Sequence, residues 1–228
     1  MEVPPEFVEV NNERQKLEKA LNIMISKIGP IPIANTRIMP YGWRKAAKGR
    51  TVWRIIEEII SQNLEKNHVE YGFETVSPAE SEVGVYDFEF KLPDGSTSFV
   101  NIKSAVDGTK PSKDDISKGD KLLYFYREHL NENLYVATFV IKFHDDMTIT
   151  LEKCIVFPVS WIPDVYVNPS NNGNLQSSFY KDLSKATFRT NEEFEEKLFS
   201  ALEVATKKKK RKFESITLDL LTDDPNNH

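Results

Sequence analysis

The sequence contains only one cysteine, Cys154, so the chain can form neither an internal disulfide nor a zinc site built on a CxxC pair. No apolar stretch approaches the roughly 18 residues needed to span a bilayer, and the first residues lack the basic and apolar regions of a signal peptide. The GxxxxGK[ST], GxGxxG and GxSxG motifs are also missing. We therefore expect a protein of the reducing cytoplasm, and P-loop hydrolases, dehydrogenases and α/β-hydrolases lack support.

The composition is that of a folded protein. Hydrophobic residues make up 39% and aromatic residues 11% of the 228 positions, which is enough apolar surface to offset the entropy lost on folding. A chain of this length falls within the usual range of one domain, so we expect a single domain.

Charge is distributed unevenly along the chain, although the net charge is −5. Residues 65–94 are mainly acidic, whereas residues 35–56 contain no carboxylate and residues 207–212 are all basic. A local basic surface can bind phosphates whatever the sign of the net charge. The basic side chains of residues 35–56 are Arg37, Arg44, Lys45, Lys48, Arg50 and Arg54.

Hydrophobic spacing predicts helices and strands in alternation, and hence an α/β fold. Apolar residues at helical spacing predict helices over 12–28, 51–66, 114–130 and 192–206. Alternating patterns predict strands over 73–76, 86–92, 98–106, 134–143 and 148–157, the second and third joined by a turn at 93–96. Residues 168–178, rich in Asn, Ser and Gly, are expected to form a long polar loop.

The predicted hairpin of residues 86–106 carries the main candidate site. Across a short turn, Asp87 can lie beside Asn101, and strand alternation places Asn101 and Lys103 on one face with Ile102 on the other. A carboxylate, an amide oxygen and an ammonium then converge. Phosphodiester hydrolysis uses this set, because Mg²⁺ takes oxygen ligands and a cation stabilises the phosphate during attack.

Asp87 followed by Asn101-Ile102-Lys103 resembles the motif of the PD-(D/E)xK nucleases, and in particular the type II restriction endonucleases similar to HpaI, EcoRV and SwaI. Gly49 with the pair Glu57-Glu58 resembles the glycine and paired glutamates found upstream in HpaI. The stretch from Asn168 to Gln176, with residues 179–182 behind it, is similar to a later Asn- and Gly-rich segment. The resemblance covers about residues 45–212.

The resemblance implies a mixed five-stranded sheet flanked by helices, acting as a homodimer that cuts both strands of a DNA palindrome. Asp87 would bind Mg²⁺, Ile102 would lend its backbone carbonyl, and Lys103 would activate the water or hold the phosphate. Glu57 or Glu58 would supply an acid. Residues 35–212 would form the catalytic and DNA-binding core and residues 1–34 a dimerisation element, with residues 222–228 a frayed tail. A bacterial cytoplasmic enzyme of this kind implies a cognate DNA methyltransferase as a genetic partner only.

Asn101 departs from the family pattern, which has Asp or Glu at this position. An amide oxygen can bind Mg²⁺ but carries no charge, so we expect weaker metal binding. Glu89, two residues from Asp87, is a candidate to compensate. Without compensation the protein would bind DNA but not cut it. A solvent-exposed strand face is the alternative interpretation of Asp87, Glu89 and Lys103.

Two segments are candidates for DNA contact. The basic stretch, with Arg37, Arg44, Lys45, Lys48 and Arg50, is expected to bind phosphates; an ordinary basic surface is the alternative. Side-chain amides of the polar loop can pair with adenine in the major groove, which favours an AT-rich target; an ordinary polar surface loop is again the alternative. These amide candidates are Asn168, Asn171, Asn172, Asn174 and Gln176.

Overall fold

A computed structural model of the chain describes residues 3–43, 48–79, 84–93, 95–109 and 112–222, with only the backbone of residues 48–51 and 212–222. The described helices are α1 (Val8–Ile28), α2 (Lys48–Tyr71), α3 (Gly119–Glu128) and α4 (Asn191–Thr222), with short 3-10 turns at Pro5–Phe7, Val159–Trp161 and Leu183–Lys185. The helices predicted at 12–28, 51–66 and 192–206 are confirmed, each within a longer helix.

The larger sheet has the strand order β1-β7-β6-β4-β3-β2, in which only the pair β4 and β6 is parallel. The predicted mixed five-stranded sheet is present, and the two-residue strand β1 extends it at one edge. The strands are β1 (Ile31–Pro32), β2 (Thr75–Pro78), β3 (Phe88–Lys91), β4 (Thr97–Val106), β6 (Leu134–Phe143) and β7 (Thr148–Pro158).

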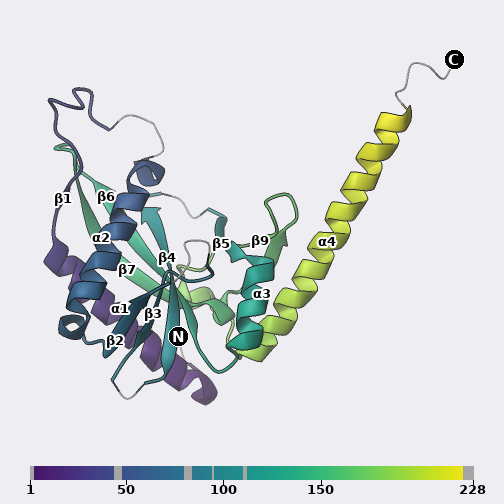
Figure 1. Ribbon diagram of the computed structural model, residues 1–228, viewed down its shortest axis with the longest axis horizontal. Coiled ribbons are helices and arrows are strands. Elements are labelled where there is room, and N and C mark those ends of the chain that lie inside the picture. Colours follow the sequence, from purple (N-terminus) through teal and green to yellow (C-terminus); the bar gives the residue numbers. More distant parts are fainter. Residues whose placement is uncertain (1–2, 44–47, 80–83, 94, 110–111, 223–228) are drawn as a thin grey trace.

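Two apolar clusters cover the sheet on its two faces. Val100 and Ile102 of β4 pack in one cluster with α1 and α2. Phe99 packs in the other, with α3 and the start of α4. Alternate residues of β4 therefore belong to different layers, and the α/β class with helices flanking a mixed sheet is confirmed (Figure 1).

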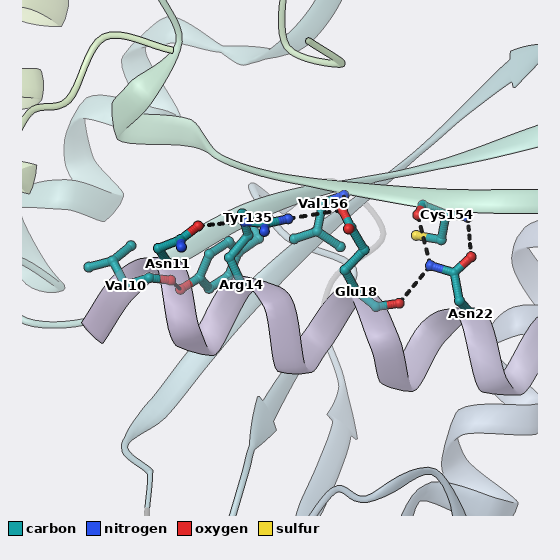
Figure 2. A network of polar contacts seen from close by, with 8 residues as sticks. All are labelled: Val10, Asn11, Arg14, Glu18, Asn22, Tyr135, Cys154 and Val156. Carbon is teal, nitrogen blue, oxygen red and sulfur yellow. Dashed lines mark hydrogen bonds and ion pairs between the residues drawn. The ribbon is translucent and has the colours of Figure 1, made fainter. Parts of the chain in front are cut away.

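Helix α1 binds the backbone of β7 through polar side chains (Figure 2). Asn22 Oδ1 accepts from the N–H of Cys154 at 3.0 Å while Asn22 Nδ2 donates to the carbonyl of the same residue at 2.9 Å. One turn earlier, Glu18 accepts from the N–H of Val156 at 2.9 Å. These side chains occupy backbone groups that a further strand would otherwise pair with. The dimerisation role of residues 1–34 stays a prediction, and the apolar face of α1 is buried within the chain.

Two predictions of local structure are wrong. Residues 114–118 form the strand β5 (Asp114–Lys118), and α3 begins only at Gly119. The expected polar loop contains β9 (Asn174–Ser177) and the end of β8 (Tyr166–Asn168), which join β5 in a second sheet of order β5-β9-β8. The partners of β5 lie more than fifty residues away along the chain, so local spacing did not show the pairing.

Helix α4 runs away from the rest of the molecule at its C-terminal end (Figure 1). The expected frayed tail falls almost wholly on residues outside the described ranges. Among the described residues, no helix is both long and apolar enough to cross a membrane.

Candidate active site

The hairpin of β3 and β4 holds Asp87 directly against β4. Phe88 pairs with Val100, and the N–H of Asp87 donates to the carbonyl of Val100 at 2.7 Å. The N–H of Ile102 then donates to Oδ2 of Asp87 at 2.5 Å. Asp87 is therefore fixed at both its backbone and its carboxylate, beside the segment that carries Asn101 and Lys103.

Asn101 is buried, with 8% of its surface exposed. Its Nδ2 donates to the carbonyl of Val85 at 2.7 Å, which fixes the orientation of the amide. Its Oδ1 is also buried and has no hydrogen-bond partner among the described residues. A buried acceptor without a partner is costly, and an amide oxygen of this kind is able to bind a cation.

Asp87, Asn101 and Lys103 line one cavity of about 360 Å³, as the hairpin prediction requires. Helix α2 contributes Glu57 to the wall of this cavity. The elements β5, α3 and β9 also contribute to the wall. The other lining residues are Trp53, Arg54, Gly84, Ile102, Asp115, Ile116, Ser117, Lys118, Lys121 and Asn174.

Burial dominates the electrostatics of the central pair. It raises the pKa of Asp87 above its usual value, while the Ile102 N–H and the nearby Lys103 ammonium oppose that rise and Glu57 adds to it. Burial also lowers the pKa of Lys103, against the attraction of Asp87, Asp115 and Glu57. Both charged forms are thus costly in the cavity, and a cation beside Asp87 would offset part of that cost.

The three candidate second acids occupy different places. Glu57 lines the central cavity and accepts from Arg54 at 3.2 Å. Glu58 lines an adjoining cavity that also contains Asp87, and it accepts from Gln62 at 2.7 Å. Glu89 sits in β3 opposite Phe99 and lines neither cavity.

The donor set fits a magnesium site with few protein ligands. Within the described residues no group of three or more His, Cys, Asp or Glu side chains is arranged to hold a metal. Mg²⁺, however, keeps several waters and is usually bound through one or two carboxylates. The unpaired Oδ1 of Asn101, a residue that lines the same cavity as Asp87, is the observation that supports such a site. Asp87, Asn101 and the carbonyl of Ile102 are the residues that would hold the ion.

Most of the amides predicted to read bases surround Asp115 instead of standing free. Asn171 donates to both carboxylate oxygens of Asp115, at 3.0 and 2.7 Å. Asn174 and Gln176 add hydrogen bonds of 3.0 and 2.6 Å. Asn168 donates to Gln176 Oε1 at 3.1 Å. Asn172 is exposed at the tip of the hairpin. Base reading by these residues stays a prediction.

The basic stretch is described only in part. Arg37 is exposed in a turn, and it does not line the cavity. Arg44 and Lys45 lie outside the described residues. Lys48 and Arg50 fall in the first turns of α2, but their side chains lie outside the described part of the structure.

Four polar cavity residues between positions 115 and 121 are not among the predicted site residues: Asp115, Ser117, Lys118 and Lys121. The helix predicted over 114–130 gives no reason to place them beside Asp87. The alternation of Asp115 and Ser117 with the apolar Ile116 was an available indication of a strand.

Comparison with known proteins gives no match by sequence and a distant likeness by structure. No family model matches the chain, and no curated protein matches it. Among solved structures, NlaIV restriction endonuclease is similar, with 15% sequence identity over 74% of this chain and 74% of that chain and a TM-score of 0.44. A likeness at this level says nothing of the activity or substrate of the present chain.

Proposed function

We propose that this protein is a Mg²⁺-dependent type II restriction endonuclease. It would hydrolyse duplex DNA at a short palindrome, leaving 5′-phosphate and 3′-hydroxyl ends. The observation that carries the proposal is that Asp87, Asn101 and Lys103 line one cavity, in which the carboxylate of Asp87 is desolvated and Oδ1 of Asn101 has no hydrogen-bond partner among the described residues. The motif resemblance of these residues to the PD-(D/E)xK nucleases supports it.

The residues of the cavity have distinct roles in this proposal. Mg²⁺, when bound, would supply Lewis-acid stabilisation of the charge that develops on the phosphate. The carboxylate of Asp87, whose orientation is fixed by the N–H of Ile102, would help to hold the ion. Lys103 holds a non-bridging phosphate oxygen or the attacking water. Glu57 is favoured over Glu58 and Glu89 as the second acid because it lines the same cavity as the other three groups.

The proposed homodimer follows from a palindromic target, and the proposed ends follow from the motif resemblance. A two-fold symmetric homodimer reads a palindrome and delivers one active site to each strand. The motif resemblance to HpaI and EcoRV favours blunt ends, and the amide of Asn172, exposed at the tip of the hairpin of β8 and β9, favours an AT-rich sequence. A cognate methyltransferase would protect the host genome without binding this protein.

A noncatalytic DNA-binding protein is the second candidate. It is favoured by Asn101, since this residue lacks the charge of a carboxylate and its Nδ2 is engaged by Val85. On this alternative, the chain keeps the nuclease arrangement and binds DNA without cutting it.

Incubation with mixed-sequence plasmid and Mg²⁺ separates these functions. Discrete fragments are expected for a restriction endonuclease; an intact plasmid with a gel shift would support the binder, and nicking confined to junctions or damaged sites would support a repair nuclease. Lys103→Ala should abolish cleavage and spare binding. Lys91→Ala is the matched control, because Lys91 lies on the same hairpin but pairs with Glu74 away from the cavity. Cleavage by Lys103→Ala at the wild-type rate would refute the site assignment.

A further inference from the structure

One wall of the cavity that contains Asp87 and Lys103 carries polar and cationic side chains from β5 and α3. It is formed where β5 ends and α3 begins, and it presents Ser117, Lys118 and Lys121 to the cavity. We call these three residues the β5–α3 wall. Neither the hairpin motif nor the basic stretch of residues 35–56 includes them.

The backbone of β5 explains how Asp115 and Lys118, three residues apart, reach the same cavity. In a regular strand, neighbouring side chains point to opposite faces. The pairing of β5 with β9 is shifted between Asp115 and Ser117, a bulge that leaves Ile116 without a partner and turns its side chain into the core. Bulges re-aim side chains beside active sites, and here Asp115, Ser117 and Lys118 all line the cavity.

The wall is anchored to the hairpin of β8 and β9 at two points. The first is Asp115, whose two oxygens accept four hydrogen bonds from Asn171, Asn174 and Gln176. The four hydrogen bonds from these three amide nitrogens fill the acceptor positions of one carboxylate, so Asp115 holds the wall in a fixed position against the hairpin.

The second anchor is Gly119. Its N–H donates to the carbonyl of Gly173 at 3.0 Å. A Cβ at position 119 would lie 2.9 Å from the same oxygen and 3.0 Å from Leu202, so only glycine allows this approach. Lys118 immediately precedes the contact, and Lys121 follows it on the first turn of α3.

The charged side chains that line the cavity indicate what kind of ligand the β5–α3 wall binds. Cations come from Arg54, Lys103, Lys118 and Lys121, and carboxylates from Glu57, Asp87 and Asp115. Arg54 pairs with Glu57, and Asp115 is satisfied by the amides. Lys118 is exposed, and within the described part of the chain it forms no ion pair. An exposed ammonium beside a phosphodiester-cleaving centre suits an anionic sugar-phosphate strand.

We propose that the β5–α3 wall binds the sugar-phosphate backbone of the DNA strand and holds it against Asp87 and Lys103, with Lys118 and Lys121 each contacting a phosphate. The inference rests on the proposed function, since it assigns a substrate contact to that site. It gives the amides of Asn171, Asn174 and Gln176 a positioning role, through Asp115, in place of base reading.

Binding without cleavage tests the wall directly. The affinity of the full-length protein for a mixed-sequence duplex oligonucleotide is measured without Mg²⁺ over a range of salt concentrations. Lys118→Ala and Lys121→Ala should each weaken binding about three- to tenfold and lower the slope of log K against log[salt] by about one. The matched control is Lys19→Ala, an exposed lysine of α1 that lies outside the cavity.

The anchor at Asp115 is tested with Asn171→Ala, which removes two of the four hydrogen bonds to Asp115. It should weaken binding while all lysines remain, whereas Ser170→Ala, exposed on the same hairpin, should not. Thermal melting of every variant separates loss of a contact from loss of the fold.

The outcomes separate this inference from the proposed function. Salt-dependent binding that is unchanged in Lys118→Ala and Lys121→Ala would overturn the wall and leave the nuclease proposal standing. Binding that depends on these lysines, in a protein that cleaves no DNA with Mg²⁺, would support the wall and refute the nuclease. A wild-type protein that binds no duplex at any salt concentration would refute both.

Discussion

The backbone N–H of Ile102 donates to Oδ2 of Asp87 at 2.5 Å, so the carboxylate is bound by the strand that carries Asn101 and Lys103. This one hydrogen bond fixes the relative position of the acid and the lysine across the hairpin. Within the described part of the chain, the hydrogen bond shown for this carboxylate is to Oδ2, which leaves Oδ1 for a ligand in the cavity. The buried negative charge of Asp87 is costly by itself, and a cation bound beside it would reduce that cost.

Asp87→Asn is predicted to abolish cleavage and to make the metal-free protein more stable. The asparagine oxygen can still accept from Ile102, so the hairpin is retained. Because burial raises the folded-state pKa of Asp87 above its unfolded value, the ionised carboxylate opposes folding at neutral pH, and the neutral amide removes that cost. Cleavage should fall about a hundredfold or more, since metal-ion stabilisation is worth several kcal/mol.

The two effects of Asp87→Asn are measured separately. Cleavage is followed on plasmid with Mg²⁺, and the melting temperature is taken without metal. Asp107→Asn, an exposed carboxylate at the end of β4, is the control. A melting temperature that falls in Asp87→Asn would contradict the burial argument even if cleavage is lost.

Asn101→Asp is predicted to lower the stability of the metal-free protein and to raise its affinity for Mg²⁺. An aspartate cannot donate to the carbonyl of Val85, so the 2.7 Å hydrogen bond is lost, at a cost of about 1–3 kcal/mol. The new carboxylate also repels Asp87 when no metal is present. Mg²⁺ should therefore stabilise the variant more than the wild type, because ligands that bind only the folded state raise its stability. The melting temperature with and without Mg²⁺ checks this, and equal shifts in both proteins would place the ligand elsewhere.

The hairpin and its candidate residues could be predicted because the information is local. Asp87, Asn101 and Lys103 lie within a short stretch whose alternation and turn fix the register. The surroundings of Asp115 could not be predicted in this way. Its amide partners are 56 to 61 residues further along the chain, and the alternation of Asp115, Ile116 and Ser117 is only a short local indication of a strand before the helix that follows.

The same limit applies to the second acid. Glu57 and Glu58 are adjacent in sequence, and helical spacing alone does not show which one faces the sheet. Packing decides it: Val52, Ile56 and Ile60 are buried against the core, which turns Glu57 toward the cavity and leaves Glu58 more exposed.

Glu57→Gln is predicted to slow cleavage at least about tenfold, whereas Glu58→Gln and Glu89→Gln should cleave within about twofold of the wild type. Glu57 alone of the three lines the cavity with Asn101 and Lys103. Initial cleavage rates at saturating Mg²⁺ give the comparison. A large loss in Glu58→Gln, with Glu57→Gln unaffected, would move the second acid to the adjoining cavity.

Asp114→Asn is predicted to weaken the second sheet in a pH-dependent way. Burial alone would raise the pKa of Asp114, but hydrogen bonds from Lys181, Ser112 and Tyr180 outweigh it and hold this pKa below its usual value of 3.8. A depressed folded-state pKa stabilises the fold at pH values above the unfolded pKa, and this stabilisation is lost as the pH falls through the folded value.

The unfolding free energy of Asp114→Asn should therefore lie about 1–2 kcal/mol below that of the wild type at pH 7, and the gap should shrink below about pH 4. Urea denaturation from pH 7 down to pH 3 measures it, with Asp107→Asn as the exposed control. Lys181, which donates to Asp114 at 2.9 Å, provides an independent check, because Lys181→Met should remove much of the same pH dependence. A gap that stays constant from pH 7 to pH 3 would show that the ionised carboxylate is not what stabilises β5 against Tyr180 and Lys181.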